Sequence, residues 1–185
     1  MDAPQPGHFW KTPFIWEPGC RRPPELGSLA FEPIDRPWLE RALAEVMAHS
    51  VDESDIHVVA KYGANRAALD LLAVCPQHFE QLAGWWQAAV DAAGDRVGFT
   101  LPVLFRHPAP GKDARPEGTI FYMGVLPQHR GQGFGYALLE QATRTCIAAD
   151  CWRILCDTSS SNEPMMRAFR KAGYLEREPW QRPLE

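Results

Sequence analysis

Residues 124–139 read GVLPQHRGQGFGYALL and form the most informative stretch of the chain. An apolar run leads into a turn with glycines at positions 131, 133 and 135, and an amphipathic helical pattern begins there. Glycine lets an anion approach the main chain closely, and the amides at a helix N-terminus point toward such an anion. The stretch therefore predicts a phosphate-binding turn between a strand and a helix, because a tight turn alone does not need three glycines.

Two common phosphate-binding loops do not fit this turn. A P-loop requires Gly-Lys followed by Ser or Thr, whereas the Gly111-Lys112 pair of this chain is followed by Asp113. A dinucleotide fingerprint requires Gly-x-Gly-x-x-Gly and an acidic residue at the end of the next strand. Here the spacing is Gly-x-Gly-x-Gly, and Asp150 precedes the next predicted strand. P-loop nucleotides and nicotinamide cofactors are both disfavoured.

Hydrophobic periodicity on either side of the turn predicts a mixed arrangement of helices and strands. Pro102 lies inside one predicted strand, which indicates an edge position or a bulge. The predicted helices cover 35–48, 64–74, 134–146 and 165–172, and the predicted strands cover 87–92, 97–105, 119–126 and 153–158.

The first 34 residues are expected to form an irregular arm. Eight of the 17 prolines lie in residues 1–37, a density that argues against a regular helix or a central strand. The aromatic residues of this arm either pin it to the domain or line a substrate pocket. We favour the first reading, since aromatic side chains usually serve packing.

Length and composition exclude several other classes of protein. With 185 residues and 45% hydrophobic content the chain fits one folded domain, and its net charge of -4 argues against nucleic acid as a partner. We see neither a signal peptide nor an apolar run long enough to span a membrane, so we expect a cytoplasmic protein. The five cysteines include no Cys-x-x-Cys pair, and we expect free thiols and no metal site.

A second motif lies downstream, where residues 162–174 read NEPMMRAFRKAGY. Together with the glycine turn, it resembles the GNAT superfamily of N-acetyltransferases. Arg130, Gly133 and Gly135 match the family's Gln/Arg-x-x-Gly-x-Gly/Ala motif, and 162–174 is similar to its Asn-containing helix. The resemblance covers about residues 96–176. It implies that residues 1–185 form a single α/β (α+β) domain with the GNAT fold, a mixed, mostly antiparallel sheet flanked by helices.

The resemblance also implies an acetyl-CoA site. Amides of residues 131–136 would hold the pyrophosphate of coenzyme A, and the backbone of Met123 and Val125 would pair with pantetheine. Asn162 would hydrogen-bond the pantetheine arm, although a role as helix N-cap is equally open. The full set of implied coenzyme-binding residues is Met123, Gly124, Val125, Arg130, Gly131, Gln132, Gly133, Phe134, Gly135, Tyr136, Asn162 and Phe169.

Catalytic residues follow from the same resemblance. Asp157 lies where some relatives carry the carboxylate general base, and a loop-capping role for it is also open. The usual general acid, a Tyr, is replaced by Phe169, which has no proton to give. Tyr174 or a water would then protonate the thiolate, or the thiolate would leave unassisted.

The expected function is transfer of an acetyl group from acetyl-CoA to a primary amine by direct attack, without a metal. The alternative is a catalytically silent acyl-CoA sensor or interaction module. We expect a small-molecule or peptide amine as the partner, no nucleic acid or membrane, and leave a homodimer open. The sequence does not specify the acceptor.

Overall fold

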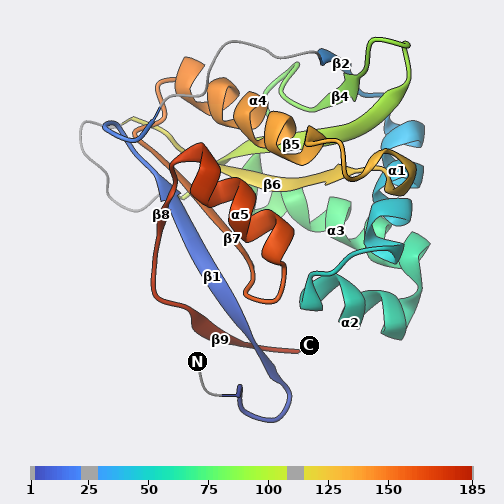
Figure 1. The fold of residues 1–185 in the computed structure, drawn as a ribbon, viewed down its shortest axis with the longest axis vertical. Coiled ribbons are helices and arrows are strands. Elements are labelled where there is room, and N and C mark those ends of the chain that lie inside the picture. Colours follow the sequence, from blue (N-terminus) through green and yellow to red (C-terminus); the bar gives the residue numbers. More distant parts are fainter. Residues whose placement is uncertain (1–2, 22–28, 108–114, 185) are drawn as a thin grey trace.

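The computed structural model describes residues 3–21, 29–107 and 115–184. A nine-stranded sheet contains the central path β2-β4-β5-β6-β7-β1-β8, while β3 pairs with β5 and β9 pairs with β1. Helices α1–α3 lie on one face of this sheet, and α4 and α5 lie on the other (Figure 1). Its ladders are antiparallel apart from that between β6 and β7. The prediction of a mixed, mostly antiparallel sheet flanked by helices is confirmed.

The sequence analysis predicted the strands β4 to β7 and the helices α1, α3, α4 and α5. It missed helix α2 and the strands β1, β2, β3, β8 and β9. The strands are β1 (His8–Trp16), β2 (Ala30–Pro33), β3 (Phe79–Glu80), β4 (Gln87–Val90), β5 (Arg96–Phe105), β6 (Glu117–Val125), β7 (Arg153–Ser159), β8 (Leu175–Glu176) and β9 (Trp180–Pro183). The helices are α1 (Arg36–Ala48), α2 (Glu53–Tyr62), α3 (Ala64–His78), α4 (Phe134–Ala148) and α5 (Glu163–Ala172).

The prediction of an irregular arm over residues 1–34 is wrong for residues 8–16 and 30–33, which form β1 and β2. Strand β1 lies inside the sheet, with β7 along one side and β8 and β9 along the other (Figure 1). The prolines permit this because only Pro13 falls within the strand, where its carbonyl accepts a bond from Arg177 N at 2.9 Å. Phe9, Phe14 and Trp16 are buried, so these aromatic side chains do pack the domain.

Helix ends follow capping chemistry. Asp35 caps α1 by accepting a bond from Trp38 N at 2.9 Å, and Gly173 ends α5 in the left-handed region with φ +81°. Helix α3 does not stop before Pro76 but continues to His78. The sequence analysis therefore located this end too early.

The sheet opens between β6 and β7. These two strands pair only at Glu117–Arg153 and Gly118–Ile154, after which they separate. On its other side, β6 stays paired with β5 through a register shift at Pro102, which leaves Phe121 as the extra residue of a bulge. Of the two alternatives that Pro102 indicated, an edge position or a bulge, the structure has the bulge. The separation leaves the backbone of β6 unpaired by β7 along residues 119–125.

Candidate active site

A cleft of about 1710 Å³ opens where β6 and β7 separate. The inner strands β6, β7 and β1 form its floor, the helices α2 and α3 form one wall, and the turn before α4 together with α5 forms the other. The cleft therefore joins the free edge of β6 to the glycine turn. The sequence analysis placed both of these features in one ligand site.

The glycine turn has the backbone that its glycines were expected to allow. Gly131 and Gly133 both have φ +81°, a region that L side chains rarely adopt, and open space lies where their Cβ atoms would be. Gly133 is also the N-cap of α4. The amide of Tyr136 already donates to Gly133 O at 3.1 Å, so the amides before it are the better donors for an anion.

Arg130 fastens the turn to the rest of the domain. Its Nε donates to Val125 O at 3.2 Å, and its guanidinium also donates to His49 O at 2.7 Å, just beyond α1. The side chain thus joins β6, the turn and the end of α1. This arrangement gives Arg130 a positioning role as well as its expected place beside the pyrophosphate.

Residues Met123 to Val125 line the cleft along the free edge of β6. Gly124 has a packing reason to be glycine, because a Cβ there would lie 2.5 Å from Val46 Cγ1 of α1. Helix α1 can therefore approach β6 closely. The neighbouring backbone is free of β7 and has room for an extended ligand to pair with it.

Asn162 and Phe169 both line the cleft from α5. Asn162 caps the helix, since its Oδ1 accepts a bond from Met165 N at 3.3 Å. The ring of Phe169 is only 3% exposed and stacks on Phe14 with centroids 4.6 Å apart. Tyr174 does not line the cleft, and its hydroxyl lies 2.6 Å from Thr143 Oγ1 in the core. Tyr174 is therefore not placed to protonate a thiolate that leaves in the cleft.

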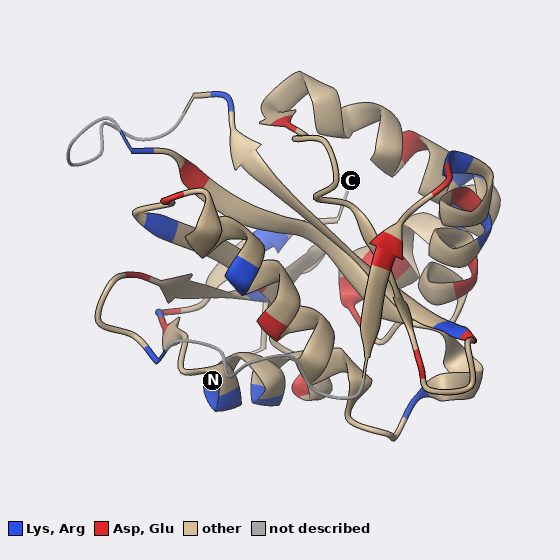
Figure 2. Cartoon of the chain, turned by 90° about the horizontal axis from the view of Figure 1, so that it is seen from above, with Lys and Arg blue, Asp and Glu red and all other residues tan. Residues whose placement is uncertain are grey.

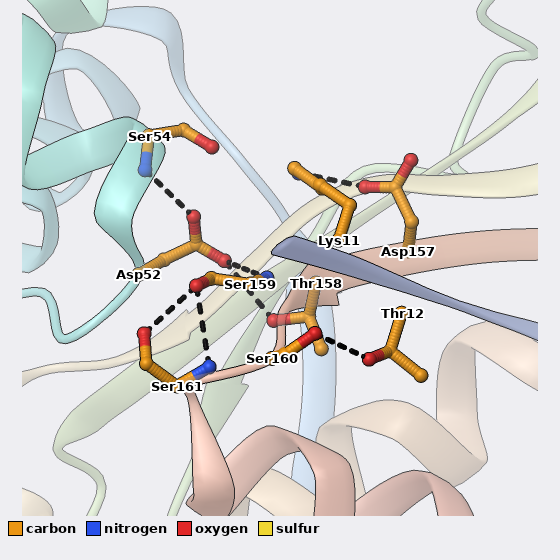
Figure 3. A network of polar contacts seen from close by, with 9 residues as sticks. All are labelled: Lys11, Thr12, Asp52, Ser54, Asp157, Thr158, Ser159, Ser160 and Ser161. Atoms are coloured by element: carbon orange, nitrogen blue, oxygen red, sulfur yellow. Dashed lines mark hydrogen bonds and ion pairs between the residues drawn. The ribbon is translucent and has the colours of Figure 1, made fainter. Parts of the chain in front are cut away.

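Asp157 lies on β7 beside the cleft, and its carboxylate pairs with an unexpected cation. Lys11 Nζ, on the adjacent strand β1, donates to Asp157 Oδ1 at 2.7 Å (Figure 3). The Lys11 side chain is 10% exposed, whereas that of Asp157 is 39% exposed. The predicted base is therefore accessible from the cleft but already holds a buried ammonium group.

Asp52, the N-cap of α2, links this helix to the end of β7 (Figure 3). It caps α2 through Ser54 N at 3.0 Å, and its other oxygen accepts bonds from Ser159 N at 2.8 Å and Thr158 Oγ1 at 3.0 Å on β7. Burial opposes ionisation of this carboxyl, but Lys11 and these donors outweigh it and lower its pKa. The two carboxylate oxygens of Asp52 thus hold α2 against the end of β7.

Asp55, in the first turn of α2, is the second carboxylate of this wall. Its Oδ2 accepts bonds from Ser50 Oγ at 2.6 Å and from Tyr122 Oη at 2.7 Å on β6. Burial raises the pKa of Asp55, and the two donors only partly offset this effect. Burial and the neighbouring charge of Asp55 raise the pKa of Tyr122 well above its usual value, so the phenol stays protonated as the donor.

The sequence analysis missed Lys11, Asp52, Asp55 and Tyr122. Asp52 carried a usable signal, because an N-cap residue followed by the acidic Glu53 and Asp55 is typical of a helix start. Lys11 was hidden in the proline-rich segment that was interpreted as an arm. Nothing in the local pattern separates Tyr122 from the other residues of its strand.

Charge over the rest of the molecule is mixed. Lys and Arg residues are interspersed with Asp and Glu along the ribbon (Figure 2). In residues 3–21, 29–107 and 115–184, no group of three or more His, Cys, Asp or Glu side chains has the arrangement of a metal site. None of the helices in these same ranges is long and apolar enough to cross a membrane.

Comparison with known proteins identifies relatives of this fold. A family model described as the acetyltransferase (GNAT) family matches residues 59–174, which begins earlier than the 96–176 expected from the motifs. Among solved structures, the aminoglycoside acetyltransferase AAC(6')-Iy with a CoA bisubstrate analogue has a TM-score of 0.52 and 19% identity. That match covers 82% of this chain and 94% of the other.

Two further structures are similar. AAC(6')-IG of Acinetobacter haemolyticus has a TM-score of 0.50 and 18% identity, over 80% of this chain and 92% of the other. A GCN5-related glucosamine N-acetyltransferase region of a fungal multidomain β-N-acetylglucosaminidase has a TM-score of 0.58 and 12% identity, covering 97% of this chain. The chain spans only 21% of that protein and 52% of another matched structure. At these identities, the likeness concerns the fold.

Proposed function

Because this chain belongs to the GNAT acetyltransferase family, we propose that it transfers the acetyl group of acetyl-CoA to a primary amine by direct attack. One observation carries the proposal: the free edge of β6 and the glycine turn before α4 open on the same cleft. A strand edge pairs with an extended amide chain, and a helix N-terminus binds phosphate. Coenzyme A combines these two chemical features in one molecule.

The donor side of the proposed site follows from this fit. Amides of the turn from Gly131 to Gly135 hold the pyrophosphate, and the backbone of Met123 and Val125 pairs with pantetheine. Asn162 adds a side-chain contact from the start of α5, and Arg130 keeps the turn in place through its bonds to Val125 O and His49 O. When bound, acetyl-CoA supplies an activated thioester carbonyl. The chain then has to position the amine and accept its proton.

The proposed reaction conserves all atoms. The amine nitrogen forms a bond to the carbonyl carbon, the carbon–sulfur bond breaks, and the thiolate leaves with its electron pair. We propose that Asp157 receives the proton of the attacking amine, directly or through water. Phe169 cannot protonate the leaving group, so a water donates that proton or the thiolate leaves unprotonated, since its conjugate acid has a pKa of about 8.5. No covalent enzyme intermediate is needed.

Lys11 positions the proposed base, Asp157. Its ion pair with Asp157 Oδ1 holds the carboxylate at the edge of the cleft and leaves Oδ2 outside this contact. Lys11 is thus a positioning residue for Asp157. The pair also joins β1 to β7 at the position where the reaction is proposed to occur.

Two measurements test the proposed function. Thermal unfolding is followed with acetyl-CoA and with NAD, and acetyl transfer to a panel of amines is followed by release of free thiol. A rise in melting temperature with acetyl-CoA alone, together with an acetylated amine, is the expected result. Binding without transfer to any amine would instead favour the silent sensor, whereas a flat melting temperature would exclude both.

A further inference from the structure

We infer that the acceptor is a primary amine on an apolar body, with its ammonium group at Asp55 and its body against an aromatic wall formed by Phe79, Phe105 and Phe121. This inference rests on the proposed function, since it specifies the acceptor side of the same cleft. It goes further by naming the chemical class of the acceptor.

The aromatic wall is continuous and faces the cleft. The ring centroids of Phe79 and Phe105 are 5.2 Å apart, and those of Phe79 and Phe121 are 5.5 Å apart. All three side chains line the cleft and are only half-buried. Leu71 and Val74 of α3 extend the wall. These side chains present carbon to a ligand, and their burial favours an apolar ligand surface.

Asp55 is linked to the Phe121 end of this aromatic wall. Phe121 and Tyr122 are consecutive residues of β6, and the phenol of Tyr122 bonds the Asp55 carboxylate. The wall and the carboxylate are therefore joined through one short segment of a strand. A ligand that contacts both must carry its polar group at one end.

Asp55 also has an unmet need for a cation. The residue is 9% exposed, and within the part of the chain that the structure describes it forms no ion pair. Its two bonds come from uncharged hydroxyl groups, and both reach Oδ2. The other two carboxylates at this part of the cleft are engaged, Asp52 by three donors and Asp157 by Lys11. An ammonium group at Asp55 would supply the missing charge partner, and its proton would then pass to Asp157 through water, since both carboxylates line the same cleft.

A polyhydroxylated acceptor fits this wall poorly. Hydroxyl and ammonium groups of such an acceptor that point at the three Phe rings would lose water and gain no hydrogen bonds there, which disfavours binding relative to a purely apolar body. The aminoglycoside acetyltransferases share the fold with this chain, but the chemistry of the wall argues for a different acceptor. An arylalkylamine or alkylamine of low charge matches both ends.

The test begins with binding alone, so that it does not depend on turnover. Calorimetric titration of the protein loaded with coenzyme A uses phenethylamine and hexylamine as apolar amines, and neamine and spermidine as polar polycations. Both apolar amines are expected to bind at least about tenfold more tightly than neamine. Equal or tighter binding of neamine or spermidine would overturn the inference.

Two variants locate the binding determinants. Phe79→Ala is expected to weaken phenethylamine about tenfold and to leave methylamine unchanged, while Phe31→Ala on β2, outside the cleft, serves as the matched control. Asp55→Asn is expected to weaken both apolar amines. Asp70→Asn, whose carboxylate pairs with Arg66 on α3, is the control for loss of a cleft carboxylate.

If Asp55→Asn fails to fold, the pH dependence of phenethylamine binding replaces it. Asp52 opposes ionisation of Asp55 and Lys11 favours it, and loss of the Tyr122 hydroxyl in Tyr122→Phe removes another stabiliser of the charged form. Binding should therefore weaken toward acid pH in the wild type and at a higher pH in the variant. Identical profiles would overturn the role of Asp55. Besides Lys11, Asp52 and Tyr122, the titratable groups that line the same cleft are His49, Tyr62, Asp70, His78, His129, Arg130, Tyr136, Cys156, Asp157, Arg167, Lys171 and Arg182.

The outcomes separate this inference from the proposed function. Tight binding of phenethylamine without acetyl transfer would leave the acceptor site in place and contradict the proposed reaction. Acetyl transfer to neamine but not to phenethylamine would support the reaction and contradict the inferred acceptor class.

Discussion

Tyr122 donates its hydroxyl hydrogen to Asp55 Oδ2 over 2.7 Å, and this bond fastens helix α2 to strand β6 beside the bulge. It places a buried carboxylate next to the strand edge on which the thioester is proposed to lie. The same contact keeps the phenol protonated, because the charge of Asp55 opposes its ionisation. The two residues therefore act as one unit.

Replacement of Asp55 by Asn should change how stability depends on pH. The pKa of Asp55 is raised above 3.8 in the folded protein, so the folded state holds this proton to a higher pH than the unfolded chain does. The contribution of Asp55 to the free energy of unfolding is therefore fully present below the pKa that this residue has in the unfolded chain. It is lost as pH rises through the pKa that the residue has in the folded protein. Asp55→Asn avoids that loss and should gain stability relative to the wild type as pH rises above about 4, the pKa of an unperturbed Asp.

Urea unfolding at several pH values measures this difference. Asp35→Asn provides a control of opposite sign, because the bond from Arg96 lowers the pKa of Asp35 and its stabilisation is lost as pH falls. A difference between Asp55→Asn and wild type that does not vary with pH would contradict the burial of an ionisable carboxyl at this position.

Gly133→Val should abolish stabilisation by acetyl-CoA. At a hundred times its dissociation constant, a ligand that binds only the native state adds about 2.7 kcal/mol of stability, which raises the melting temperature. Valine is strained at φ +81°, and its side chain occupies space next to the turn where the phosphate is proposed to lie. Gly94→Val, in the β4–β5 turn at φ +89°, has the same strain outside the cleft and should keep the shift.

Asp157→Asn should lower turnover roughly 100-fold and leave the affinity for coenzyme A nearly unchanged. The amide cannot accept the proton of the amine, although it can still accept a bond from Lys11. Steady-state rates against amine concentration, together with thermal shifts in coenzyme A, measure both quantities. Wild-type turnover at neutral pH would make Asp157 a partner of Lys11 only.

Phe169→Tyr should keep coenzyme affinity and raise turnover. The ring already lines the cleft and stacks on Phe14, so the packing of the ring is preserved while a phenol is added. A proton donor beside the departing sulfur acts mainly in the transition state, which raises kcat more than it changes KM. Loss of coenzyme binding in a folded variant would show that this ring serves as a packing wall.

The features of this structure that could be predicted are those set by interactions between residues close together in the sequence. The turn from Gly131 to Gly135 and the cap at Asp35 follow from local backbone and capping chemistry, and both are found where expected. Strand β1 was mispredicted because the proline density was averaged over residues 1–37, whereas the strand itself contains only Pro13. A strand tolerates one proline when its partner strands are in place. The Asp55–Tyr122 bond was out of reach because it joins residues 67 positions apart.

The position of β1 has a consequence for how the chain acquires its native state. Phe14 pairs with Cys156 on one side and with Glu176 on the other, so strand β1 is synthesised well before both of its partner strands, β7 and β8. Until those strands are made, its edges are unpaired, a condition that exposes a nascent chain to intermolecular strand pairing. Contacts this distant also slow folding, because a long loop must close before they form. Lys11 and Asp157 can meet only after β7 is made, later than the turn from Gly131 to Gly135 that is proposed to hold the pyrophosphate.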